Sequence, residues 1–232
     1  MLIKKAIILA AGFGKRLLPL TKVQPKPLLE VGGKKLIEHS IHLLRKNNIT
    51  DIIVNSHYLH EKISEFITKK YSSISISYEK NILDTGGGIL NVIDFFDQEN
   101  FFVLNSDTVW NEAYSNDLNQ LKEIFKNSNN KAALLLADKK NSFDKKLSGD
   151  FGLDQNNLLN KDNDDYIYTG CQLLNPSIFN SKKKGDIFSM NEIWNDLIEQ
   201  KSLNGVISQC PFLHATDLEI YNQLNNLKTI DW

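Results

Sequence analysis

Short apolar runs alternate with amphipathic stretches along the first half of the chain. The runs that predict strands cover residues 6–9, 51–55, 74–78, 101–104 and 132–137. Apolar residues at helical spacing predict helices over residues 36–47, 60–70, 88–96 and 118–125. Such alternation is typical of a mostly parallel sheet with helices on both faces. We therefore expect an α/β fold with a Rossmann-like, mixed sheet.

The second half of the chain is less regular. Residues 141–165 are polar and predict a loop-rich region with a hairpin around 154–157. The remaining predicted elements are a strand over 166–174, a helix over 190–200, a strand over 205–209 and a helix over 217–227. Since no linker or repeat interrupts the pattern, we expect residues 1–232 to form a single domain.

Composition narrows the function classes. The chain has 232 residues, of which 41% are hydrophobic and 24% charged, which suits one globular domain with a sizeable core. A net charge of −1 gives no basic surplus, so we expect neither nucleic acid nor membrane as a partner. The apolar run near the N-terminus is too short to span a membrane. Cys171 and Cys210 lie far apart in sequence, which favours a reduced, cytoplasmic protein.

The loop after the first predicted strand carries the most specific chemistry. Small residues at positions 10–14 let backbone amides approach a ligand closely and form an anion-binding concavity. Lys15 and Arg16 follow at once, and Lys26 stands between two prolines. This layout suits a polyphosphate and hence a nucleoside triphosphate. The glycine pair alone could equally be an ordinary turn, and it matches neither the P-loop nor the dinucleotide fingerprint.

The whole string over residues 12–27, G-x-G-x-R-x-x-P-x-T-x-x-x-P-K-P, is far more specific. It resembles the signature of the sugar-1-phosphate nucleotidyltransferases, and the similarity continues to His39. The resemblance implies the nucleotide-diphospho-sugar transferase fold. It also implies an enzyme whose partners are a nucleoside triphosphate and a sugar 1-phosphate, and which releases pyrophosphate.

The resemblance assigns roles to this loop residue by residue. Arg16 and Lys26 would be catalytic: Arg16 covers the β- and γ-phosphates, and Lys26 bridges the α-phosphate and the sugar phosphate. The nucleotide-binding residues of the loop would be Ala10, Ala11, Gly12, Gly14 and Lys15.

A second string, D-T-G-G-G-I over residues 84–89, precedes a predicted helix. Glycines at a helix entrance allow close approach to a flat ligand, although a flexible turn would look the same. In the family this segment lies beside the nucleobase, which implies nucleotide binding by Thr85, Gly86 and Gly87. Its form most resembles the N-acetylmuramate-1-phosphate uridylyltransferases and also occurs in some mannose-1-phosphate guanylyltransferases.

The predicted strand over 101–104 ends in Asn105, Ser106 and Asp107. Carboxylates at the carboxyl ends of parallel strands lie where α/β sheets bind ligands, and Mg²⁺ prefers one or two carboxylates plus phosphate oxygens. The family has N-G-D here, so Ser106 replaces a glycine. The resemblance implies that Asp107 is catalytic and binds Mg²⁺ as the cofactor.

Two further segments, 149–152 and 168–171, resemble family segments that bind the sugar. The resemblance implies a sugar site made by Asn105, Asp150, Thr169 and Gly170. Tyr168, between them, could equally be a core aromatic residue.

The last motif, F-L-H-A-T-D over residues 212–217, departs from the family pattern W-x-D-V-G-T. The second metal carboxylate of the family falls on His214, and neutral imidazole is a poor Mg²⁺ ligand. We expect His214 to face the metal or the phosphates, directly or through water. Asp217 either replaces the missing carboxylate or caps the last helix.

The resemblance favours UTP and N-acetylmuramate 1-phosphate as substrates, in peptidoglycan recycling. The alternatives are a mannose-1-phosphate guanylyltransferase and a glucose-1-phosphate uridylyl- or thymidylyltransferase. A non-catalytic sugar-nucleotide sensor is the alternative of another class, because His214 stands where a metal ligand is expected. No hexapeptide repeat of the left-handed β-helix kind is visible, so we expect a bare catalytic domain that is a monomer or a weak homo-oligomer.

Overall fold

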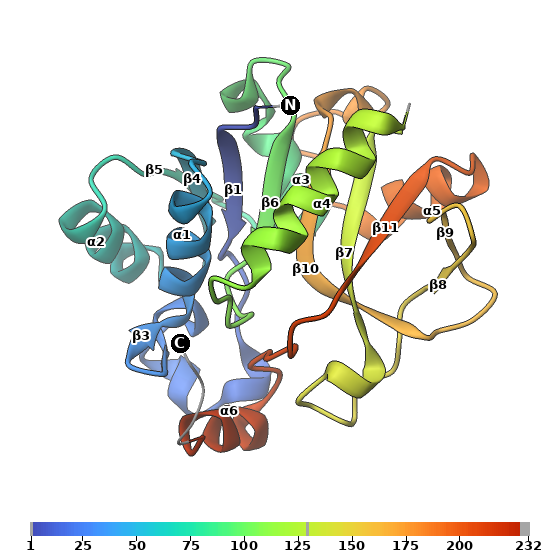
Figure 1. Ribbon diagram of the computed structural model, residues 1–232. Helices are drawn as coiled ribbons and strands as arrows, with labels where there is room; N and C mark the ends of the chain where they lie inside the picture. The colour runs from blue at the N-terminus through green and yellow to red at the C-terminus, as the bar shows by residue number, and fades with distance from the viewer. Residues whose placement is uncertain (1, 129, 228–232) are drawn as a thin grey trace.

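A computed structural model describes residues 2–128 and 130–227, and its centre is a seven-stranded sheet (Figure 1). The strand order is β11-β7-β10-β6-β1-β4-β5. The strands are β1 (Lys5–Leu9), β4 (Asp51–Ser56), β5 (Ser75–Tyr78), β6 (Phe101–Asn105), β7 (Ala132–Asp138), β10 (Tyr166–Leu174) and β11 (Leu203–Ser208). Only β10 runs antiparallel to its neighbours in this sheet. The predicted mixed, mostly parallel sheet is confirmed.

Helices cover both faces of the sheet, as the apolar pattern predicts. One face packs against α1 (Leu36–Lys46), α2 (His60–Lys70) and α4 (Tyr114–Asn127), and the other against α3 (Asp84–Asn91) and α5 (Met190–Glu199). Because side chains alternate along a strand, Ile8 of β1 lies in the first core and Ile7 in the second. Both are fully buried, which explains why β1 has no polar alternation.

A third apolar cluster lies below the carboxyl ends of the strands. It joins the first loop to α6 (Leu218–Asn225), which Figure 1 shows at the bottom of the molecule, and includes Leu17, Leu29, Leu213 and Ile220. The short strands β2 (Glu30–Val31) and β3 (Lys34–Lys35) form a hairpin between the first loop and α1. These contacts fix the first loop against the C-terminal part of the described chain.

Helix α3 begins earlier than the sequence predicts. The predicted helix over 88–96 is divided into α3, which starts at Asp84, and a 3₁₀ helix, η4 (Ile93–Phe96). The early start has a tertiary cause, because the amides of Gly86 and Gly87 both donate to the carbonyl of Phe188. A Cβ atom on Gly87 would lie 2.4 Å from the carbonyl oxygen of Asp186, so only glycine allows this approach.

The other elements agree with the prediction within a few residues. The predicted hairpin is present as β8 (Gly152–Leu153) and β9 (Leu159–Asn160). β11 starts two residues before the predicted strand, because Leu203 and Asn204 already pair with β7. None of the helices in the described part of the chain has the length and apolar character that crossing a bilayer requires.

A buried carboxylate ties α1 to the end of α2. Glu38 is 4% exposed and accepts hydrogen bonds from the Tyr71 hydroxyl at 2.5 Å and from the Lys35 amide at 2.9 Å. The Lys70 ammonium lies 2.6 Å away. Burial alone would raise the pKa of Glu38, but these partners outweigh it and lower the pKa to about 2.

Because of this network, we expect part of the free energy of unfolding to be lost at acidic pH. Because the folded pKa of Glu38 is depressed from 4.5, its contribution is present above that value and is lost as the pH falls toward about 2. We expect Glu38→Gln to lower the free energy of unfolding by about 2 kcal/mol at pH 7, after allowance for the exposed Lys70. The difference in the free energy of unfolding between Glu38→Gln and the wild type should be about 1 kcal/mol smaller near pH 3.5 than at pH 7.

Denaturant unfolding at both pH values measures this difference. Glu61→Gln, on the exposed side of α2, is the matched control and should change stability by less than about 0.5 kcal/mol. A difference between Glu38→Gln and wild type that stays constant with pH would contradict the assignment.

Candidate active site

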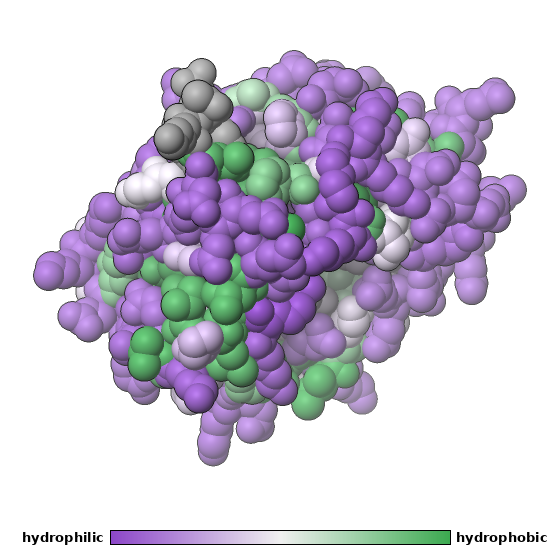
Figure 2. All heavy atoms as spheres, turned by 90° about the horizontal axis from the view of Figure 1, so that it is seen from below, coloured by the Kyte–Doolittle hydropathy of each residue, from purple (hydrophilic) through white to green (hydrophobic). Residues whose placement is uncertain are grey.

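A cleft of about 350 Å³ lies at the carboxyl ends of four adjacent parallel strands, β6, β1, β4 and β5. Leu9 of β1 stands in register with Asn55 of β4 and with Asn105 of β6, so these three residues share one edge of the sheet. Glu79 follows the end of β5 and also lines the cleft. Figure 2 views the molecule from this end, where the surface is mostly polar with an apolar area on one side. The volume is within the range of small-molecule sites, roughly 300–1,000 Å³.

The first loop folds tightly along one wall of the cleft. Gly14 has a φ of +63°, and a Cβ atom there would lie 2.9 Å from Cγ2 of Thr21. The Thr21 hydroxyl donates to the Gly14 carbonyl at 3.0 Å, which closes the loop. Glycine is therefore required at this position both for its backbone conformation and for space. The loop residues that line the cleft are Ala10, Ala11, Gly12, Gly14, Lys15, Arg16 and Lys26.

Aromatic contacts hold the tip of this loop. The Phe13 ring packs edge-on against His57 and lies 5.6 Å from the Tyr58 ring. The Tyr58 hydroxyl donates to the carbonyl of Thr21. Lys15 lies over the Phe13 ring, with Nζ 5.3 Å from its centre. The loop that carries the cleft cations Lys15, Arg16 and Lys26 is thus fixed to the residues that follow β4.

The side chains of Lys26 and His214 converge on one carboxylate at one end of the cleft. Lys26 Nζ lies 2.5 Å from Asp107 Oδ2, and His214 Nε2 lies 3.0 Å from the same oxygen. Burial alone would raise the pKa of Asp107, but the charges of Lys26 and His214 outweigh it and hold the pKa well below its usual range. The structure therefore brings together Lys26, Asp107 and His214, which come from three distant parts of the sequence.

The second carboxylate oxygen, Asp107 Oδ1, is buried and makes no hydrogen bond within the described chain. A buried acceptor without a partner points to a ligand. Asp217 does not replace the missing family carboxylate, because its Oδ1 accepts the Ile220 amide at 2.9 Å and caps α6. Of the alternatives that the sequence leaves open, the structure has Asp217 as the helix cap and His214 beside Asp107.

The opposite end of the cleft contains a network that the sequence analysis missed. The side chain of Asn55 accepts the Ala10 amide at 2.8 Å and donates to Glu79 Oε1 at 2.6 Å. The other oxygen of Glu79 accepts the Leu83 amide. Burial raises the pKa of Glu79, in contrast to Asp107. The only sequence signal was that each residue ends or follows a predicted strand.

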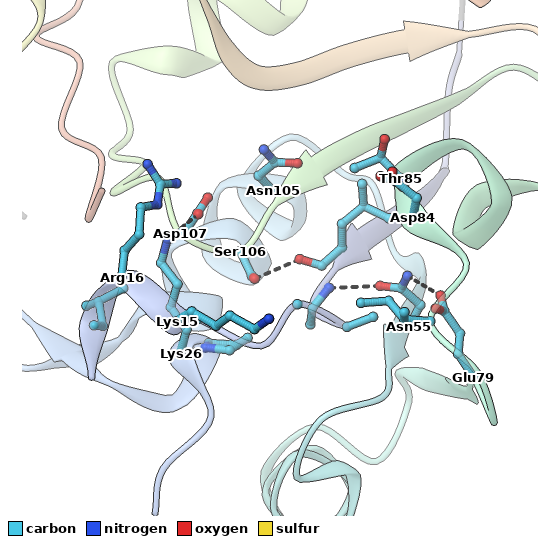
Figure 3. A pocket seen from close by; sticks show the side chains of 18 of the residues that line it. Lys15, Arg16, Lys26, Asn55, Glu79, Asp84, Thr85, Asn105, Ser106 and Asp107 are labelled. Carbon is cyan, nitrogen blue, oxygen red and sulfur yellow. Dashed lines mark hydrogen bonds and ion pairs between the residues drawn. The ribbon is translucent and has the colours of Figure 1, made fainter. Parts of the chain in front are cut away.

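Figure 3 shows the cleft as two chemically different ends. One end carries Arg16, Lys15, Lys26 and Asp107, and the other carries Asn55, Glu79, Asp84 and Thr85. Asn105 and Ser106 lie between them. A ligand with a polyanionic part and a neutral, flat part matches this division.

The glycine segment of α3 divides between the cleft and the interior. Thr85 lines the cleft, and its hydroxyl accepts the Met190 amide at 2.9 Å. Gly86 and Gly87 are buried, and both amides donate to Phe188. Thr85 is therefore the member of this predicted segment that lines the cleft, whereas the two glycines pack α3 against residues 186–188.

The predicted sugar residues gather around the bulge of β10. Gly170 has a φ of +89°, and a Cβ atom there would lie 2.8 Å from Cβ of Asn105, which lines the cleft. Asp150 accepts the Tyr168 amide at 2.8 Å and stands outside the cleft lining. The Thr169 hydroxyl turns away and donates to the carbonyl of Leu135. The structure thus places Asn105 and Gly170 together, whereas Asp150 lies beside β10, in the segment before β8, and the Thr169 hydroxyl points toward β7.

Comparison with known proteins gives a consistent result. The family model described as nucleotidyl transferase matches residues 5–144. N-acetylmuramate alpha-1-phosphate uridylyltransferase of Caulobacter vibrioides is 29% identical over 92% of this chain and 92% of its own length. D-glycero-alpha-D-manno-heptose 1-phosphate guanylyltransferase of Campylobacter jejuni is 32% identical over 81% of this chain and 83% of its own.

Solved structures share the fold of this chain. The solved structure of the inositol-1-phosphate CTP transferase from T. maritima superposes with a TM-score of 0.77 at 15% identity, over 98% of both chains. At this identity the similarity concerns the fold alone. It confirms the predicted nucleotide-diphospho-sugar transferase fold.

The Asn55 network predicts a stability effect. Asn55→Ala leaves the Ala10 amide and a Glu79 oxygen without partners in a buried place, so we expect a loss of about 1–3 kcal/mol in the free energy of unfolding. Asn156→Ala, at an exposed position in the β8–β9 turn, is the control and should change stability by less than about 0.5 kcal/mol. Equal stability of Asn55→Ala and its control would mean that the network contributes nothing to folding.

Proposed function

The chain belongs to the nucleotidyl transferase family, and from that premise we propose that it transfers the uridylyl group of UTP to N-acetylmuramate 1-phosphate. The observation that carries the proposal is the division of the cleft into a cationic end and a polar, less charged end. The relatives named above are sugar-1-phosphate nucleotidyltransferases, and the chain is an enzyme of this class. One sheet that includes strands from both halves of the chain supports a single catalytic domain.

The reaction joins two anions and needs little covalent help. An oxygen of the sugar phosphate attacks the α-phosphorus of UTP, and the bond from this phosphorus to the bridging oxygen of the β-phosphate breaks. Pyrophosphate leaves with the electron pair. The attacking group is already an anion near neutral pH, so no general base is required. Positioning and neutralisation of charge therefore carry most of the catalysis.

The cations of the cleft suit this task. In our proposal Arg16 and the backbone of residues 12–15 bind the β- and γ-phosphates, and Lys26 bridges the α-phosphate and the sugar phosphate. Two prolines flank Lys26, so the direction of its side chain is preset. Its ion pair with Asp107, at 2.5 Å, holds the ammonium at the cationic end before any phosphate arrives.

The residues of this end fit a Mg²⁺ ion that arrives with the triphosphate. Asp107 offers a buried oxygen, Oδ1, without a partner among the described residues. Nowhere in residues 2–128 and 130–227 do three side chains of His, Cys, Asp or Glu gather as a metal site, so the nucleotide has to supply most other ligands. When bound, the ion would neutralise charge that develops on the α-phosphate.

At the other end we propose that the base lies near Thr85, Asn55 and Glu79, and that the sugar contacts Asn105 and Gly170. Asp150 lies in the segment before β8 and Thr169 on β10, and in our proposal both complete the sugar site. Gly86 and Gly87 would act on the base only indirectly, because their amides are already donated to Phe188. Their packing sets the position of Thr85.

The choice of UTP and N-acetylmuramate 1-phosphate has two supports. The string D-T-G-G-G-I has the form of the uridylyltransferases, and the Caulobacter relative matches over nearly the whole length of both chains. This choice implies a role in peptidoglycan recycling in the cytoplasm. The Campylobacter relative, at 32% identity, favours a second candidate, a guanylyltransferase that acts on a heptose or mannose 1-phosphate.

A pyrophosphate-release assay separates these candidates. It combines UTP, GTP, CTP and dTTP with the 1-phosphates of N-acetylmuramate, the manno-heptose, mannose and glucose. We expect the highest kcat/KM with UTP and N-acetylmuramate 1-phosphate. A preference for GTP would overturn the substrate assignment and leave the reaction class intact.

Lys26→Ala tests the proposed bridging cation. We expect kcat/KM to fall about 10²–10³-fold, on the analogy of a lost oxyanion donor. The free energy of unfolding should fall as well, because the ion pair with the largely buried Asp107 is lost, but the protein should remain folded. Lys22→Ala, an exposed lysine on the same loop, should retain nearly full activity. Wild-type kcat/KM in Lys26→Ala would remove this side chain from the mechanism.

Asp107→Asn tests the proposed cation site. The amide keeps the shape but loses the charge that a hard dication needs, so we expect turnover to be abolished across a Mg²⁺ titration. Circular dichroism controls for folding, and Asp162→Asn, in an exposed loop, controls for the loss of one surface carboxylate. Full activity at ordinary Mg²⁺ concentrations would place the metal elsewhere.

A further inference from the structure

Thr216 is a cleft residue that the proposed mechanism does not use. Among the described residues that line the cleft, it is the only one that follows Asp107 in the sequence. The amide of the preceding residue, Ala215, donates to the carbonyl of Asp107 at 3.1 Å, which places Thr216 at the cationic end. The family pattern W-x-D-V-G-T has a glycine at this position, so the motif itself assigns no task to a side chain here.

The hydroxyl of Thr216 is bound to a carboxylate outside the cleft lining. It donates to Asp144 Oδ2 at 2.6 Å, and the two residues are only 2% and 4% exposed. Asp144 Oδ1 accepts the Lys146 amide at 3.0 Å, so each carboxylate oxygen has a donor. A distance near 2.6 Å is typical of a hydroxyl that donates to a carboxylate. The side chain of Thr216 is therefore fixed from behind the wall of the cleft.

The segment that carries Asp144 is itself fixed beside the segment before α6. The Phe143 amide donates to the carbonyl of Phe212 at 2.9 Å, and the Phe212 amide donates to the carbonyl of Asn141 at 2.8 Å. These main-chain bonds involve no residue of the cleft lining. Asp144 is thus an anchor whose position does not depend on a ligand.

A tight turn links this anchor to the cationic end. The Thr216 amide donates to the carbonyl of His214, two residues before it, at 2.8 Å. His214 Nε2 lies 3.0 Å from Asp107 Oδ2, and the Ala215 amide holds the main chain of Asp107. A displacement of Thr216 would therefore move both contacts of this segment with Asp107, and with them the ion pair between Asp107 and Lys26.

We propose that Thr216, anchored by Asp144, is a positioning residue for nucleotidyl transfer. This proposal rests on the proposed function, in which Lys26 bridges the α-phosphate and the sugar phosphate. Thr216 keeps His214 in place against Asp107, and Asp107 in turn directs Lys26 toward the reacting phosphates. A misplacement of about 1 Å in such an array costs roughly 10²-fold in rate. Loss of the anchor should therefore lower kcat, whereas the first loop continues to bind the nucleotide.

Thr216→Val removes the hydroxyl and keeps the shape of the side chain. We expect kcat for pyrophosphate release to fall at least about tenfold, while KM for UTP changes less than about threefold. Thr216→Ser keeps a hydroxyl for Asp144 and should retain kcat within about threefold of the wild type. Should Thr216→Val not fold, Asp144→Asn takes its place with the same expectation, because an amide offers one acceptor to two donors.

Ser142→Ala is the matched control. It removes another buried hydrogen bond of the same segment, from Ser142 Oγ to the main-chain carbonyl of Asp144 at 2.9 Å. It should lower the unfolding midpoint much as Thr216→Val does and leave kcat near the wild-type value. The proposal is overturned if kcat falls equally in Thr216→Val and Ser142→Ala, if Thr216→Ser loses as much as Thr216→Val, or if only KM changes.

Crystal structures of the same variants measure the positioning without activity. We expect the distance from His214 Nε2 to Asp107 Oδ2 to exceed about 3.5 Å in Thr216→Val and to stay near 3.0 Å in Ser142→Ala. An unchanged distance in Thr216→Val overturns the proposal. If the wild type turns over no pair of triphosphate and sugar 1-phosphate while this displacement is observed, the proposed function is refuted and the anchoring of Asp107 through Thr216 stands.

Discussion

The carboxylate of Asp107 is the point at which three distant parts of the chain meet. Lys26 reaches it from the first loop and His214 from the segment before α6, and Asp107 itself lies two residues after β6, the middle strand of the sheet. One carboxylate and the cations around it leave this end of the cleft with a surplus of positive charge. A polyphosphate neutralises that surplus, which means that the ligand-free arrangement is already preorganised for its ligand.

Two carboxylates in one cleft have opposite electrostatic environments. The pKa of Asp107 is lowered by Lys26 and His214 beside it, whereas burial raises the pKa of Glu79, whose side-chain oxygens accept hydrogen bonds from Asn55 and from the Leu83 amide. The electrostatic potential therefore becomes less positive from the end of the cleft with Lys26 to the end with Glu79. Nucleotides have the same division, because the triphosphate is highly charged and the base is neutral. In the proposed function, this electrostatic difference therefore favours one orientation of the nucleotide, with the triphosphate at the cationic end.

What the sequence could predict depended on whether the signal was local. The first loop was predictable, because glycines, cations and prolines within residues 12–27 carry the chemistry by themselves. Asp107 was predictable because it directly ends an apolar strand. The Asn55–Glu79 network was not, since it depends on which strands are neighbours in the sheet, and the hydrogen bond from Ala10 spans 45 positions. The early start of α3 was missed for the same reason, because the bonds that stabilise it come from Phe188.

Position 214 shows how a site can change its chemistry without changing its shape. Main-chain bonds from Val109 and Ala215 fix this residue, and they do not involve its side chain. A carboxylate or an imidazole can therefore occupy the same place beside Asp107. An imidazole here carries one negative charge fewer than the carboxylate of the family motif. The departure from the family motif therefore changes the charge beside Asp107, whereas the main-chain bonds that hold this segment do not depend on the side chain.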